Sequence, residues 1–156
     1  MSATGLDVFD TTVQKTNSWL KDIMHEMDWQ ERRKAYQALR STLHALRDRL
    51  TVDEVAQLAA QLPMLVRGFY YEGWDPTGKP LKVRDLEGFL ATIALEFRGD
   101  DEVDPDQVAR AVFTVLARRI TPGELEDIEG LLPKEVRRFW ARAETMDSQP
   151  PSGSRR

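Results

Sequence analysis

The 156-residue sequence contains no cysteine, and this absence removes several classes of function at once. Without thiols the chain has no disulfide, no thiolate nucleophile and no cysteine-based metal site. Long apolar runs are also missing, so no segment is predicted to cross a membrane. The stretch MSATGLDVFD has no basic region followed by an apolar one, which argues against a signal peptide. A cytoplasmic protein is the simplest interpretation.

An excess of positive charge is missing as well. Residues 1–78 carry 9 basic and 11 acidic side chains, and residues 79–156 carry 13 and 15, so each half has a net charge of −2. Basic clusters occur, but acidic residues interrupt each of them: Arg32–Lys34, Arg118–Arg119 and Arg137–Arg138. Because a nucleic-acid partner requires a basic surface, nucleic-acid binding is the weakest functional hypothesis considered.

An internal repeat is the most informative feature that is present. When the chain is shifted by 70 positions, residues 16–70 align with 86–140 without a gap, and 14 of the 55 pairs are identical. The identical pairs include polar residues and proline, such as Gln37 with Gln107, Arg40 with Arg110, Thr51 with Thr121, Glu54 with Glu124, and Pro63 with Pro133. A shared helical period would match only apolar positions, so the sequence indicates an internal duplication.

Each copy is predicted to form four helices. In the first helix, apolar residues recur at spacings of three and four, as a buried helical face requires: Phe9, Val13, Leu20, Ile23 and Met27. The predicted fold is therefore all-α, with two tandem four-helix units packed as one domain with approximate twofold symmetry. The units span residues 6–73 and 85–146, with a connector at 74–84 and a disordered tail at 147–156.

Local signals predict where the helices begin. Three positions combine a capping side chain with a following acid or proline, namely Thr51 with Glu54, Thr121 with Pro122 and Glu124, and Asp104 with Pro105. Asp28 followed by Glu31 is a similar pattern and is predicted to open the second helix.

The prolines and glycines predict where helices break. Pro63 and Pro133 end the third helix of each copy and suit the first turn of a fourth, over Met64–Glu72 and Lys134–Ala143. Gly73 is predicted to end the helix that begins near Met64. The leucines that precede the two prolines, Leu62 and Leu132, are predicted to be buried.

The order of these motifs resembles a known family. Arg-Leu-Thr-x-x-Glu is followed by Leu-Pro-x-x-x-Arg-x-Phe, then by an aromatic-Gly-Trp-Asp-Pro connector and a second, degenerate copy. The pattern is similar to the bacterial family catalogued as domain of unknown function 2267, over roughly Phe9 to Arg142. The resemblance implies a bacterial, cytoplasmic, all-helical protein and brings no catalytic residues to transfer.

The two histidines are the first candidates for chemistry. Asp22, His25 and Glu26 could form half of a metal site on one helix, but a di-metal bundle needs matching ligands from other helices. The duplicated positions of His25 and His44 are Leu95 and Thr114, so the second copy supplies none. We therefore predict no catalytic residue, no metal and no cofactor, and keep a metal- or small-molecule-dependent helical enzyme as the alternative.

The aromatic residues of the connector are the candidate partner patch. Tyr71 and Trp74 have no counterpart assigned by the repeat, and two prolines lie near them. They could form an exposed surface that another protein contacts, or Trp74 could fill a groove between the copies. The predicted function is a non-enzymatic protein-interaction or scaffold module whose partner is another protein, with a homo-oligomer also allowed.

Overall fold

The computed structural model describes residues 2–81, 85–132, 134, 136 and 137, and within this part of the chain it contains helices and no strand. The helices are α1 (Asp7–Met27), α2 (Arg32–Arg47), α3 (Val52–Ala59), α4 (Met64–Tyr71), α5 (Leu86–Glu96), α6 (Pro105–Arg119) and α7 (Pro122–Leu131). The all-helical class predicted from the sequence is confirmed. Among the described residues, no helix is long and apolar enough to cross a membrane.

The predicted helix starts are largely confirmed. The hydroxyl of Thr51 accepts a hydrogen bond from the Glu54 amide at 3.3 Å, and that of Thr121 accepts one from the Glu124 amide at 3.4 Å. Asp104 caps α6 in the same way, with a proline in its first turn. Each cap satisfies an amide that the first helical turn leaves without a partner, so these helices begin where the sequence places them.

The predicted break between the third and fourth helices of the first copy is also confirmed. α4 begins directly after Pro63, and Gly73 adopts a φ of 74° two residues after the helix ends. Leu62 and Leu132 are each only 2% exposed, as predicted. The predicted helix over 134–143 falls almost entirely outside the described residues, and the tail at 147–156 lies wholly outside them.

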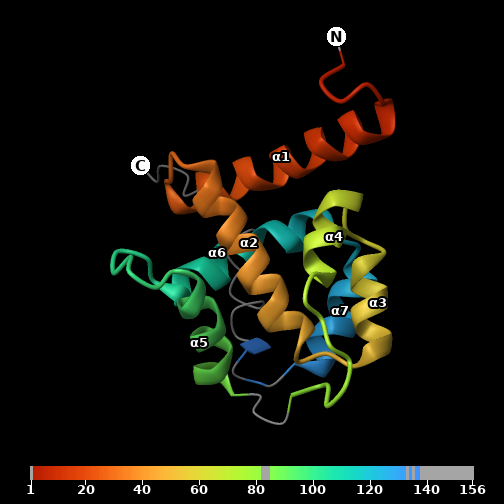
Figure 1. Ribbon diagram of the computed structural model, residues 1–156. Helices are drawn as coiled ribbons and strands as arrows, with labels where there is room; N and C mark the ends of the chain where they lie inside the picture. Colours follow the sequence, from red (N-terminus) through yellow and green to blue (C-terminus); the bar gives the residue numbers. More distant parts are fainter. Residues whose placement is uncertain (1, 82–84, 133, 135, 138–156) are drawn as a thin grey trace, which may run out of the picture.

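Two details of α1 differ from the prediction. Asp28 does not open α2: it ends α1 in a left-handed conformation with φ 55°, and Glu31 occupies the N-cap position of α2 without a side-chain capping bond. Phe9 is 46% exposed although the apolar stripe predicted it to be buried. The N-terminal half of α1 runs above α4 (Figure 1), and Phe9 lines an open cavity between these two helices and is not covered by α4.

The core lies where the helices of the two predicted copies meet. α2 packs against α1, α4, α5 and α6, and α6 packs in turn against α1 and α5. α3 and α7 lie side by side at one edge of the molecule (Figure 1). Two ion pairs join α1 to α6, between Asp22 and Arg119 at 2.6 Å and between Glu26 and Arg118 at 2.9 Å.

Burial recurs at the spacing of the sequence repeat. The following pairs, each separated by 70 residues, are buried in both members: Trp19 and Phe89, Ile23 and Ile93, Ala38 and Val108, Leu43 and Phe113, Leu46 and Leu116, Leu50 and Ile120, Val55 and Leu125, Leu58 and Ile128, Leu62 and Leu132, and Val66 and Val136. Residues that align in the sequence repeat are therefore buried to a similar extent in the structure. The proposed unit boundaries at 6–73 and 85–146 stay predictions.

Candidate functional site: an apolar groove between α1, α2 and α4

The acids beside His25 are engaged elsewhere. Asp22 and Glu26 form the ion pairs with α6 described above, while the His25 side chain is exposed. Among the described residues, no three His, Asp or Glu side chains lie close enough together to hold a metal ion. The same ion pairs occupy Arg118 and Arg119, one of the three basic clusters.

The connector aromatics pack in a short column against the core. The ring centroids of Tyr70 and Tyr71 lie 5.2 Å apart, and those of Tyr71 and Trp74 lie 5.6 Å apart. Tyr71 and Trp74 are both half-buried, and the Trp74 indole Nε1 is buried without a hydrogen-bond partner among the described residues. Much of this predicted patch therefore faces inward, and its use by a partner stays a prediction.

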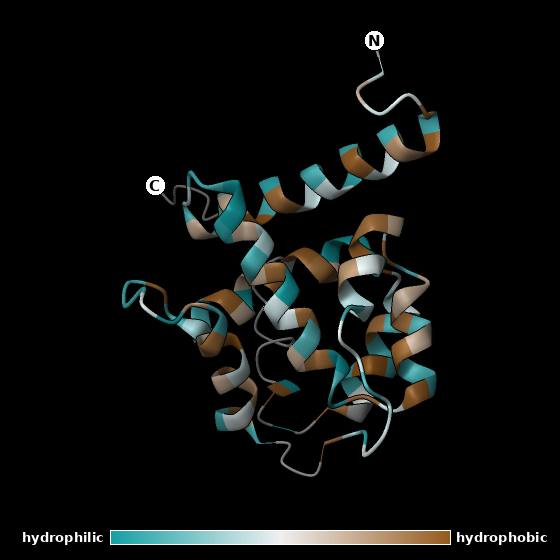
Figure 2. Ribbon diagram, viewed as in Figure 1, coloured by the Kyte–Doolittle hydropathy of each residue, from teal (hydrophilic) through white to brown (hydrophobic). Residues whose placement is uncertain are grey.

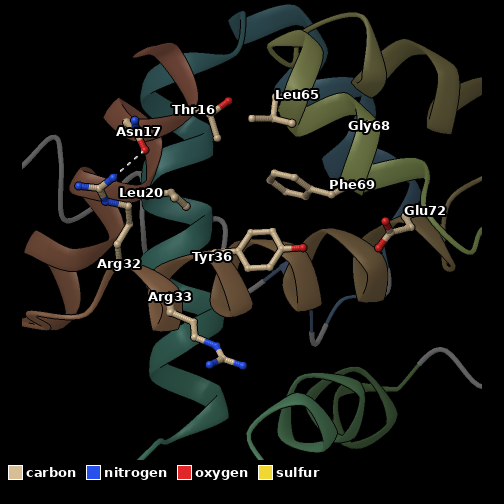
Figure 3. Close-up of a pocket in the computed structure, with 10 residues that line it drawn as sticks. All are labelled: Thr16, Asn17, Leu20, Arg32, Arg33, Tyr36, Leu65, Gly68, Phe69 and Glu72. Atoms are coloured by element: carbon tan, nitrogen blue, oxygen red, sulfur yellow. Dashed lines mark hydrogen bonds between the residues drawn. The ribbon is translucent and has the colours of Figure 1, made fainter. Parts of the chain in front are cut away.

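A deeper feature lies between α1, α2 and α4. A cavity of about 600 Å³ opens there, and its apolar lining comes from all three helices: Leu20, Tyr36, Leu65, Gly68 and Phe69. Figure 3 shows Leu65 and Phe69 directed from α4 toward α1, with the Tyr36 ring of α2 below Phe69. A second cavity of about 390 Å³ shares Leu65 and Gly68 with the first and continues toward the N-terminus of α1, past Phe9, Val13 and Met64. We refer to the two cavities together as the α1–α4 groove.

Most of the well-exposed large apolar side chains of the described residues lie on or beside the two helices that flank the groove. Of the seven large apolar side chains that are well exposed among the described residues, five lie on α1, at its N-cap or on α4: Leu6, Val8, Phe9, Met64 and Leu65, at 44–58% exposure. Figure 2 shows hydrophobic ribbon on the first turns of α1 and on α4. Phe9, Met64 and Leu65 line the second cavity together, and apolar side chains gathered in this way mark an interaction site more often than scattered single residues do.

The far wall of the groove, α4, is held firmly in place. The Leu65 amide donates to the Thr12 hydroxyl on α1 at 2.9 Å. On the other side, the buried Arg47 of α2 donates to the carbonyl oxygens of Tyr70 and Glu72, and the His44 Nε2 lies 2.7 Å from the Phe69 carbonyl. These bonds satisfy carbonyls at the end of a helix that has only eight residues. The groove is thus a preformed feature of the fold.

Burial has a clear effect on His44. Removal from water lowers its pKa below the usual value of 6.5, since the charged ring loses hydration, and the nearby guanidinium groups of Arg47 and Arg40 add to the effect. The neutral ring donates its Nε2 proton to the Phe69 carbonyl. His44 therefore acts as a structural donor behind the groove and does not line it.

The two ends of the groove carry opposite charge. Arg32 and Arg33 lie at one end, where the Arg32 guanidinium donates to the Asn17 amide oxygen at 3.4 Å (Figure 3). Glu72 lies at the other end, paired with Arg40 at 3.0 Å. The first turn of α2 holds these arginines and no acid, against the preference of a helix N-terminus for negative charge. This arrangement leaves the basic end suited to an acidic group from outside.

Gly68 is an unexpected residue in the interior of a helix. It lies inside α4 and lines both cavities, yet a Cβ atom placed on it would meet nothing within 4 Å. Glycine inside a helix costs roughly 0.5–1 kcal/mol relative to alanine. The packing of the chain with itself does not require this glycine, whereas close approach of another surface would.

The lining of the groove suits the binding of a ligand better than catalysis of a reaction. Its lining offers apolar surface, one pair of guanidinium groups and a carboxylate that is already paired, which together can hold an apolar segment with an acidic end. Leu65 and Gly68 were not predicted as site residues, and Arg32 and Arg33 were considered only as part of a basic cluster. The repeat contained a signal for two of them, because Leu65 and Gly68 align with the charged residues Glu135 and Arg138.

Comparison with known proteins identifies a family without an assigned activity. The sequence model of a family described as "Uncharacterized conserved protein (DUF2267)" matches residues 16–139. No curated protein matches the chain. The match covers most of the described helices and adds no ligand, substrate or partner to the geometry above.

Proposed function

Since the chain belongs to the uncharacterised conserved family DUF2267, its function has to be inferred from the molecule itself, and we propose that it is a non-enzymatic protein-interaction or scaffold module. The observation that carries this proposal is the α1–α4 groove, a preformed apolar channel with exposed walls and a glycine in its lining. The groove would take a helical segment of another protein.

We also propose that the described helices are two copies of one unit related by an approximate twofold axis. The recurrence of burial at a spacing of 70 residues supports this, as do the matching threonine caps of α3 and α7. The packing supports it too, because α1 contacts α6 just as its counterpart α5 contacts α2, and α3 contacts its own counterpart α7.

The proposed duplication supplies an internal comparison for the groove. Positions that build the core are apolar in both copies, and Leu20 and Phe69 of the groove recur as Leu90 and Phe139, but several other residues that line the groove are not repeated. Positions 64, 65 and 68 of the first copy correspond to Lys134, Glu135 and Arg138, and the position of Arg32 corresponds to Glu102. Because folding of the unit does not require apolar residues at 64 and 65, their presence in one copy only is best explained by binding.

The chemistry of the groove supports an amphipathic helix as its proposed ligand. An amphipathic helix places apolar side chains at spacings of three, four and seven residues, and such a row suits a channel between two helices. The basic end at Arg32 and Arg33 favours a segment with acidic residues at one end, since opposite charges set the orientation of docking.

Affinity capture with paired variants tests this proposal. Leu65→Glu puts a charge into the groove, and because Leu65 is 44% exposed the fold should tolerate it. Leu95→Glu is the matched control, since Leu95 is 61% exposed on α5, away from the groove. We expect proteins captured from native cells by the wild type and by Leu95→Glu to be absent with Leu65→Glu. Capture of the same proteins by all three would contradict the proposal.

The connector aromatics Tyr71 and Trp74 stand as a second proposed contact. Removing an indole that anchors a partner typically costs about 2 kcal/mol or more of binding free energy. If Trp74→Ala loses the captured proteins while its circular dichroism is unchanged, the partner contacts the connector as well. If it retains them, binding is confined to the α1–α4 groove.

A further inference from the structure

We propose that the α1–α4 groove binds the N-terminal turns of α1 from a second copy of this chain, so that two copies exchange these turns reciprocally. This inference rests on the proposed binding role of the groove and names its occupant. The anchor of the contact is Phe9, which each copy inserts between α1 and α4 of the other. Three independent features of the described residues support this arrangement.

The first feature is the location of exposed apolar residues on the chain. Leu6 and Phe9 are 52% and 46% exposed and stand at the start of α1, whose N-terminal half runs above α4 at the top of the molecule (Figure 1). The same helix forms one wall of the groove a few turns later, at Thr16 and Leu20. One chain therefore carries both the segment that inserts and the channel that receives it. A twofold contact has this self-complementary form.

The second feature is the polarity of charge along α1 and its surroundings. The first turn of α1 carries Asp7 and Asp10, whereas Lys21, Arg32 and Arg33 lie around its later turns, where the acids Asp22 and Glu26 are paired with arginines of α6. In an antiparallel pair of α1 helices, the acidic start of one copy lies over the basic end of the other. Both ends of the contact then bring opposite charges together.

The spacing along the helix agrees with this pairing. At a rise of about 1.5 Å per residue, a twofold axis near Val13 places Asp10 of one copy opposite Asn17 of the other, which is bonded to Arg32. The same axis brings Phe9 opposite the turn that contains Thr16 and Leu20, where the 600 Å³ cavity opens. A single alignment of the two α1 helices therefore brings Phe9 to the cavity and Asp10 close to Arg32.

The third feature is Gly68. In the proposed contact the Phe9 ring of the second copy enters the groove, which Gly68 and the chain's own Phe9 both line. A Cβ atom on Gly68 would meet nothing within 4 Å, so the entering ring has room to reach the helix backbone. The arginines in the first turn of α2, which weaken that helix electrostatically, gain acidic partners in the same contact. Two features that the single chain leaves unexplained are therefore explained by one interface.

The test is the mass of the protein in solution by sedimentation equilibrium over a wide range of concentrations. We expect a species of twice the 17.9 kDa of one chain at high concentration. Phe9→Glu should weaken association by at least about thirtyfold, as loss of a central aromatic anchor does. A glutamate in the first turn favours the helix, so the fold should be retained. The control, Leu95→Glu, should associate as the wild type does.

Two further readouts identify the interface itself. Arg32→Glu combined with Arg33→Glu should weaken association, and Asp10→Arg added to this variant should restore part of it, which a purely structural effect would not do. Because the chain has no cysteine, Val13→Cys introduces a single thiol near the proposed axis. Oxidation should then link two copies of Val13→Cys, and should not link two copies of Leu95→Cys.

The outcomes separate this inference from the proposed function. A wild type that stays monomeric at every concentration overturns the exchange of α1. A dimer that Phe9→Glu leaves intact overturns it too, because another face must then form the contact. If either result accompanies loss of captured proteins with Leu65→Glu, the groove still binds a partner and only its proposed occupant was wrong.

Discussion

Replacing Gly68 with alanine provides the sharpest test of the argument for the groove. Gly68 lies in the interior of α4, is exposed, and has no atom within 4 Å of the position a Cβ would take. The substitution therefore meets no steric cost, and the more restricted unfolded chain and better helix propensity should raise the free energy of unfolding by about 0.5–1 kcal/mol. For a chain of this size, that corresponds to an increase in melting temperature of about 1–4 °C.

Thermal and urea unfolding followed by circular dichroism would measure this gain, at concentrations where the chain is monomeric. Gly130→Ala is the matched control, because Gly130 also lies in a helix, α7, with no atom near its missing Cβ. Both alanine variants should be more stable than the wild type. A larger side chain at the same position, in Gly68→Leu, fills the groove and should abolish partner capture and self-association. If Gly68→Ala lowers stability, the fold itself requires the glycine and the reasoning from the empty space above it is refuted.

Other predictions concern stability and its dependence on pH. Leu132→Ala should lower the free energy of unfolding by roughly 2–5 kcal/mol in urea titrations, because it empties a buried site; an unchanged midpoint would place the core elsewhere. Burial and the nearby carboxylates of Asp127 and Asp53 raise the pKa of Glu54 above its usual 4.5. Folding therefore favours the protonated form of Glu54, and the stability that this proton contributes is lost as the pH rises through the pKa of the folded state. Glu54→Gln should therefore stabilise the protein at neutral pH by about 0.5 kcal/mol or less after solvent screening, and the gain should vanish below pH 4.5; a gain that persists there would contradict the assignment. His44 behaves oppositely: its lowered pKa means that stability falls as the pH drops below 6.5, and His44→Asn should remove most of that slope in pH-dependent unfolding experiments.

The position of the groove was less accessible from sequence than the helices that form it. The apolar period of α1 predicted a buried face through Phe9, but a period reports only which residues share a face. It cannot report how closely a neighbouring helix packs, and a cavity between α1 and α4 leaves Phe9 exposed. The mismatch between Leu65 and Glu135 in the repeat was available beforehand, but it gains meaning only once Leu65 is found facing an open channel.

The sequence by itself determined the local architecture: an all-helical chain, the caps at Thr51, Asp104 and Thr121, and the break at Pro63. These features follow from bonds and steric effects within one helical turn, which a short stretch of sequence contains in full.

The tertiary structure alone decided how distant residues meet. It paired Asp22 with Arg119 across 97 positions, ended α1 at Asp28, turned Tyr71 and Trp74 largely onto the core, and left Phe9 and Leu65 on the walls of an open groove. The physical reason is that burial and ion pairing depend on which helix covers which face, and that choice is made by the packing of the whole chain, not by the propensity of any one segment.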